Sequence, residues 1–137
     1  MRKLFRIDAR SIVIGTCVFC VVYLFIAFVI NQLVNSPNAV MPGGGVSRKF
    51  ISTLGMLPFL TAGFLVAFRT HPSGVFNSAL VGIAAGAFAI LYARMAVNEF
   101  PEVYSGAFGV LAGISSSLVL CALGGLLGGI TKHYIRP

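Results

Sequence analysis

The chain has 137 residues, of which 58% are hydrophobic and only 9% are charged. A soluble globular domain carries roughly 25% charged residues, so this chain lacks the polar side chains that would cover a surface in water. The formal net charge is +7, but the basic residues stand in short clusters between apolar stretches and form no basic face, which argues against a nucleic acid partner. We therefore expect the lipid bilayer to surround the chain.

Four long apolar stretches predict four transmembrane helices, at about residues 11–34, 50–69, 74–97 and 104–131. Each is near or above the roughly 20 residues that a helix needs to cross the hydrocarbon core. Backbone polar groups in lipid must be paired within the protein, so only helices or a closed barrel can span the membrane. The stretches lack the alternation of barrel strands. We expect an all-α, polytopic membrane protein of one domain, residues 1–137, with four helices in two hairpins.

The first stretch could instead be a cleaved signal sequence, because basic residues precede it. Its apolar part covers residues 12–34, which is longer than the roughly 7–15 apolar residues of a signal sequence. No small-x-small cleavage site follows it. We expect the stretch to remain as the first helix, and its bulky side chains predict a peripheral helix that faces lipid. These side chains are Phe19, Tyr23, Phe25 and Phe28.

The basic residues are distributed unevenly over the two ends and the three connections. Most stand in the two tails and the second connection: Arg2, Lys3, Arg6, Arg10, Arg69, Lys132 and Arg136. The first and third connections hold only Arg48, Lys49 and Arg94. Because basic loops stay on the cytoplasmic side, we expect both termini in the cytoplasm and the protein in the cell (inner) membrane.

Small residues recur every three or four positions along the fourth predicted helix, which places them on one helical face. This face, the small face of helix 4, consists of Gly106, Gly109, Gly113, Ser117, Cys121, Gly124 and Gly128. A shorter face on helix 3 consists of Ser78, Gly82, Gly86, Ala89 and Ala93. In lipid, helices associate where small residues let their backbones come close. We expect both faces to pack helices, either helix 3 on helix 4 or helix 4 on another copy; a pore lined by Gly and Ser is the alternative.

Few polar residues are candidates for polar or ion contacts. Asn77 stands near the inner end of helix 3, where it could cap or bridge helices. Arg94 stands near the outer end of helix 3 and could reach the interface or pair with Glu99 or Glu102. The sequence shows no Ser-His-Asp set, no paired carboxylates and no phosphate-binding loop. We therefore expect no enzymatic activity and no cofactor.

Two patterns could indicate a metal or redox site. Cys17 and Cys20 form a C-x-x-C pattern, but a reactive thiolate needs an electropositive, accessible setting, and their neighbours are apolar. His71 and His133 both follow predicted helix ends on the inner side. Two histidines without a nearby carboxylate or thiol make a poor metal site. We expect the cysteines to pack, the histidines to lie at the interface, and no metal to bind.

The segment TAGFLVAFRTHPSGVFNSALVGIAAG and the closing GGLLGG resemble small, glycine-rich, four-helix membrane proteins of bacteria and archaea. The resemblance implies a fold and a membrane location only. Small multidrug transporters are of similar length but depend on a Glu within the first membrane helix, and this chain has none there. Small fluoride channels carry a Thr/Ser/Phe-rich signature in the third helix, which VGIAAGAFAILYA does not match.

Three functions remain open at the level of the sequence. The first is a non-enzymatic membrane protein that acts through helix packing, as a homo-oligomer or as a small accessory subunit of a membrane complex. The second is a small channel or transporter with a path between helices 3 and 4. The third, a membrane enzyme, lacks an acid–base pair within the bilayer.

Overall fold

The computed structural model describes residues 7–35, 48–70, 72–96 and 106–135. Within these ranges the chain forms four α-helices: α1 (Ala9–Asn35), α2 (Arg48–Thr70), α3 (Gly74–Ala96) and α4 (Ala107–Ile135). Each helix contains a segment long and apolar enough to cross a membrane. The prediction of an all-helical chain with four membrane-length helices is confirmed. The start predicted for helix 4, at residue 104, lies outside the described residues.

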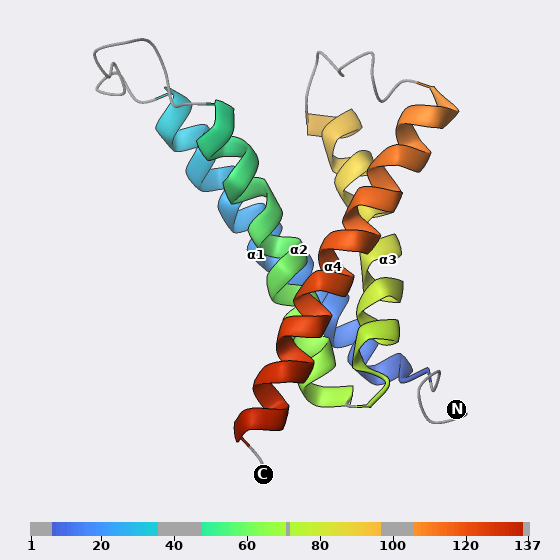
Figure 1. Ribbon diagram of the computed structural model, residues 1–137. Helices are drawn as coiled ribbons and strands as arrows, with labels where there is room; N and C mark the ends of the chain where they lie inside the picture. Colours follow the sequence, from blue (N-terminus) through green and yellow to red (C-terminus); the bar gives the residue numbers. More distant parts are fainter. Residues whose placement is uncertain (1–6, 36–47, 71, 97–105, 136–137) are drawn as a thin grey trace.

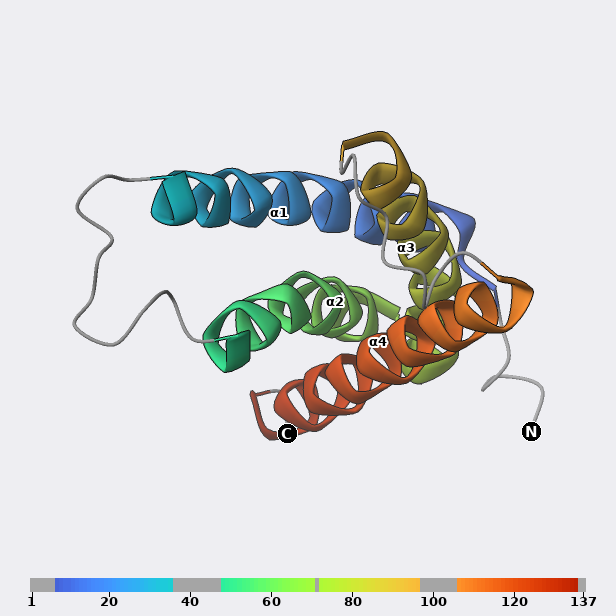
Figure 2. The same ribbon diagram turned by 90° about the horizontal axis from the view of Figure 1, so that it is seen from above.

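The four helices form a V (Figure 1). α1 begins, α2 ends, α3 begins and α4 ends at one end of the molecule, which we call the base. From the base, α1 and α2 rise together on one side, and α3 and α4 rise on the other. Figure 2 shows the same separation of the far ends from above. The two helix pairs are therefore close together near the base and apart at the opposite, open end.

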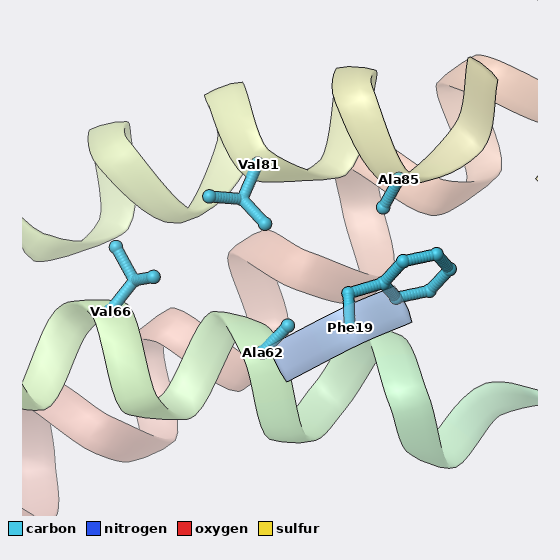
Figure 3. Packing of buried hydrophobic residues seen from close by; sticks show 5 residues of the cluster. All are labelled: Phe19, Ala62, Val66, Val81 and Ala85. Carbon is cyan, nitrogen blue, oxygen red and sulfur yellow. The ribbon is translucent and has the colours of Figure 1, made fainter. Parts of the chain in front are cut away.

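A small hydrophobic core joins α1, α2 and α3 (Figure 3). Its fully buried members are Phe19, Ala62, Val66, Val81 and Ala85. The ring of Phe19 lies 4.7 Å from that of Phe59, measured between centroids. The expectation that the bulky residues of helix 1 all face lipid is therefore wrong for Phe19, because this ring fills the space between three helices, and for Tyr23, which packs against the same core. Phe25 remains 65% exposed, so only one face of α1 is available to lipid.

Glycines bring the backbones of α2 and α4 into direct contact. A methyl group on Gly124 would collide with the carbonyl oxygen of Leu60, and one on Gly128 would collide with the carbonyl oxygen of Phe64. Gly63 of α2 in turn lies against the carbonyl of Cys121. Any side chain at these positions would push the helices apart, so the glycines fix the distance between α2 and α4.

α3 packs against the middle of α4 in the same manner. A methyl group on Gly82 would lie 2.6 Å from the Cα of Leu118, and one on Gly86 would collide with the hydroxyl of Ser117. The small face of helix 4 is thus divided between two neighbours within one chain. Its middle part lies against α3 and its last part lies against α2.

Candidate functional site

A network of polar side chains lies at the base, and Asn77 is its centre. Asn77 is fully buried in the first turn of α3. Its Oδ1 accepts a hydrogen bond from the backbone N–H of Asp8 at 3.1 Å. Its Nδ2 donates to both the carbonyl oxygen and the hydroxyl oxygen of Ser73, each at 3.1 Å. One amide side chain therefore holds the start of α1 against the turn between α2 and α3.

Asp8 begins α1 as its N-cap. The carboxylate accepts hydrogen bonds from the hydroxyl of Ser11 at 2.7 Å and from the backbone N–H of Ser11 at 3.4 Å, and the Asp8 carbonyl accepts from the N–H of Ile12. These bonds satisfy groups that a helix start otherwise leaves unpaired. The hydrogen bonds from Ser11 lower the pKa of the Asp8 carboxyl below its usual 3.8.

Three helices meet at Ser78. Its hydroxyl lies within hydrogen-bonding distance of the carbonyl oxygen of Gly63 in α2, at 2.7 Å, and of Gly74 in its own helix, at 2.8 Å. A methyl group on Gly125 of α4 would lie 2.7 Å from the same hydroxyl. Because Ser78 is completely buried, its polar atom is satisfied by helix carbonyls rather than by water.

The open half of the V contains a cavity of about 430 Å³, which we call the groove. Its walls come from the outer halves of α3 and α4, and Tyr23 of α1 and Phe59 of α2 also line it. The residues from α3 and α4 are mostly small or aliphatic: Gly86, Ala89, Ile90, Ala93, Phe108, Gly109, Ala112, Gly113, Ser116, Ser117 and Leu120. The groove opens to the surface beside Phe108, which is 85% exposed.

The two serine hydroxyls in the groove donate hydrogen bonds to carbonyl oxygens of their own helix. Ser116 lies 2.8 Å from the carbonyl oxygen of Ala112, and Ser117 lies 2.9 Å from that of Gly113. A water molecule in a cavity needs two to four polar partners. Because most of the side chains that line the groove are apolar, the groove is suited to a largely apolar occupant.

The predicted packing residues have different environments in the structure. Gly82, Gly86, Ser117, Gly124 and Gly128 lie between helices, as described above. Gly109 and Gly113 line the groove, and so do Gly86 and Ser117 where they leave the contact between α3 and α4. Gly106 has open space where a side chain would begin. The sequence pattern identified a shared face but could not show that its first part borders a cavity.

The remaining predicted polar residues are only partly described. Asn77 bridges helices at the base, whereas Arg94 is an exposed residue in the last turn of α3. Glu99 and Glu102, the expected partners of Arg94, lie outside the described residues, and so does His71. Among the residues that the structure describes, no three of His, Cys, Asp or Glu gather in a group that could hold a metal.

Sequence reasoning missed Asp8, Ser73 and Gly63. The D-x-x-S spacing before an apolar stretch is a helix-start signal that identifies Asp8. Ser73 before the third apolar stretch is a similar signal. Nothing in the sequence shows that Asp8 reaches Asn77, because the two residues are far apart in the chain and belong to different helices.

No protein-family model matches the chain, and searches of curated proteins and of solved structures find no significant match. The fold alone defines the class: four apolar helices of membrane-spanning length, packed through glycines.

Proposed function

We propose that the chain is a non-enzymatic integral membrane protein that acts through helix packing, as a homo-oligomer or as a small accessory subunit of a membrane complex. The observation that carries this proposal is a second row of small residues on α4, directed away from its own bundle. Ser115, Ala122 and Gly129 stand seven residues apart, and Val119 and Leu126 lie between them. We call these five residues the outer row.

The outer row has the properties of a contact surface for another helix. Ser115, Val119 and Leu126 are exposed, and a methyl group on Gly129 would meet nothing within 4 Å. A seven-residue repeat keeps one face of a helix in contact with a partner along a left-handed crossing. Small residues at that repeat let the partner backbone approach closely.

Substitution of Gly129 tests this surface. The leucine side chain in Gly129→Leu would meet no other residue of the same chain. We therefore expect this variant to fold but to lose its association with a second copy or with a partner protein. Gly55→Leu is the matched control, because Gly55 also has nothing within 4 Å but belongs to α2. Oligomeric state and co-purifying proteins are measured after extraction in a mild detergent.

Two results would contradict the proposal. One is a wild-type protein that is strictly monomeric and carries no membrane partner in native membranes. The other is a Gly129→Leu variant that associates as the wild type does.

Leu126→Cys, in a chain with Cys17→Ala and Cys20→Ala, distinguishes a homo-oligomer from an accessory subunit. If the protein is a homo-oligomer, two copies of this variant should become linked by a disulfide between their Cys residues at position 126. If the outer row faces a different protein, no such dimer should form.

A channel or transporter is the second candidate, and the groove is the observation that favours it, because residues of all four helices line this open space. Its mostly apolar walls suit an apolar solute better than an ion. A path between α3 and α4 themselves would have to pass Gly82 and Gly86, where α3 lies directly against α4. A path would therefore run between the two helix pairs. Solute and ion flux into liposomes tests this candidate, and flux equal to that of empty vesicles over a broad panel would reject it.

We also propose that the protein lies in the cell (inner) membrane with its base toward the cytoplasm. The helix ends at the base carry Arg10, Arg69 and Lys132, and those at the open end carry Arg48, Lys49 and Arg94. The sequence adds Arg2, Lys3 and Arg6 before α1 and Arg136 after α4, so seven basic residues belong to the side of the base and three to the other side. Basic residues near membrane helix ends favour the cytoplasmic side, which supports this orientation.

A further inference from the structure

We propose that the groove binds one acyl chain of an anionic phospholipid, with the lipid phosphate near Arg94. This site is separate from the outer row and does not depend on association with a protein partner. The evidence is the chemistry of the walls, the position of the opening and the charge at its outer end.

The walls of the groove select an apolar occupant. The serine hydroxyls in the groove already donate to carbonyls of α4, and most of the other side chains that line it are apolar. The cavity volume of about 430 Å³ falls within the range of roughly 300–1,000 Å³ that is typical of ligand sites. Apolar cavities stay dry and take apolar ligands. A flexible hydrocarbon chain fits these walls.

The opening of the groove points to lipid as the source of that chain. Phe108, Ala112 and Ser116 line the groove and are also exposed, so the opening lies along the first turns of α4. These residues belong to the segment of α4 that is apolar enough to span a membrane. In a bilayer the opening therefore faces hydrocarbon, where acyl chains are the surrounding solvent.

Charge at the outer end of the groove selects the headgroup. Ala93 lines the groove, and Arg94, the next residue, is exposed. The guanidinium group binds phosphate through paired, charge-assisted hydrogen bonds. A lipid whose chain enters the groove from the open end would place its phosphate at the level of Arg94. The positive charge of the guanidinium favours a headgroup of net negative charge over a zwitterionic one.

The test uses the full chain in nanodiscs with photoactivatable lipids. One sample contains phosphatidylglycerol with a diazirine in its acyl chain, and the other contains phosphatidylcholine with the same label. We expect phosphatidylglycerol to label the groove segments of α3 and α4 in preference to the exposed face of α1 around Val21. Equal labelling of all exposed apolar surfaces would overturn the proposal, because the contact would then be ordinary solvation by lipid.

Filling the groove supplies the second arm of the test. The double variant Ala93→Leu/Ala112→Leu adds side chains inside the groove, and Ala87→Leu adds the same side chain on the exposed face of α3, outside the groove lining. We expect the double variant to lower groove labelling by about tenfold, which corresponds to about 1.4 kcal/mol. Ala87→Leu should label as the wild type does, and circular dichroism should show equal helix content. Undiminished labelling of the folded double variant would overturn the proposal.

Arg94→Gln tests the headgroup independently of the acyl chain. This variant should keep the labelling of the groove but lose the preference for phosphatidylglycerol over phosphatidylcholine. A preference that Arg94→Gln leaves unchanged would contradict the assignment of the phosphate to Arg94. Native mass spectrometry of retained lipid provides the same comparison without a label.

Discussion

At the scale of single residues, the start of α1 depends on the Asp8 carboxylate. Asp8→Ala removes the side-chain hydrogen bonds to Ser11, so we expect a lower midpoint of thermal unfolding in detergent, measured by circular dichroism. Because these bonds lower the pKa of Asp8 below 3.8, the stabilisation is present above the unfolded-state pKa and is lost as the pH falls through the lower folded-state pKa.

Asp8→Asn is the control for this prediction. Asparagine caps helices about as well as aspartate but does not titrate, so Asp8→Asn should unfold near the wild-type midpoint at neutral pH. The difference between wild type and Asp8→Ala should shrink in strong acid, whereas that between Asp8→Asn and Asp8→Ala should persist. An Asp8→Ala midpoint equal to that of wild type at neutral pH would show that the cap contributes nothing.

The polar residues of the base show how far local sequence signals reach. The cap at Asp8 follows from spacing alone, since a short polar residue directly before an apolar helix accepts its first N–H groups. The bond from Asp8 to Asn77 depends instead on how α1 lies across α3. The sequence therefore indicated Asn77 as a candidate bridge, but it could not supply the partner.

At the scale of helices, the contact between α2 and α4 requires glycine. In Gly124→Ala the new methyl group would collide with the Leu60 carbonyl, and the two helices must separate. We expect a loss of about 1–3 kcal/mol in the free energy of unfolding, as for overpacked cores. Chemical unfolding in mixed micelles measures this loss. Gly55→Ala, in open space on α2, should be neutral or slightly stabilising because alanine favours helix.

Helix pairing was only partly visible in the sequence. The regular spacing of Gly113, Ser117 and Gly124 shows that these residues share a face. A face that runs the whole length of α4 can meet more than one neighbour, however. The choice between α2 and α3 at each turn depends on the angle at which the helices cross. Gly63, which stands outside both predicted small faces, supplies the complementary surface on α2.

At the scale of the whole molecule, the V follows from unequal side-chain volumes. Small residues near the base let α2, α3 and α4 come together, as at Gly63 and Gly125. Toward the open end, the ring of Tyr23 in α1 makes edge-to-face contacts with the rings of Phe88 and Tyr92 in α3. The groove is lined by the bulky Tyr23 and Phe59 from α1 and α2 and by mostly small or aliphatic residues from α3 and α4. Its existence depends on all four helices at once, so no single stretch of sequence predicts it.

The orientation of the whole molecule gives the last prediction. With the base in the cytoplasm, a fluorescent protein fused after the last residue should fluoresce, and alkaline phosphatase inserted between α3 and α4 should be active. The physical reason is that basic residues beside membrane helices resist transfer across the membrane, and the two tails and the connection between α2 and α3 hold more of them than the other two connections. Neutralising Arg2, Lys3, Arg6 and Arg10 while adding lysines between α3 and α4 should shift both reporters toward the opposite pattern. Reporters with the reverse activities in the unmodified chain would show that the base faces outward, and the lipid phosphate proposed near Arg94 would then belong to the inner leaflet.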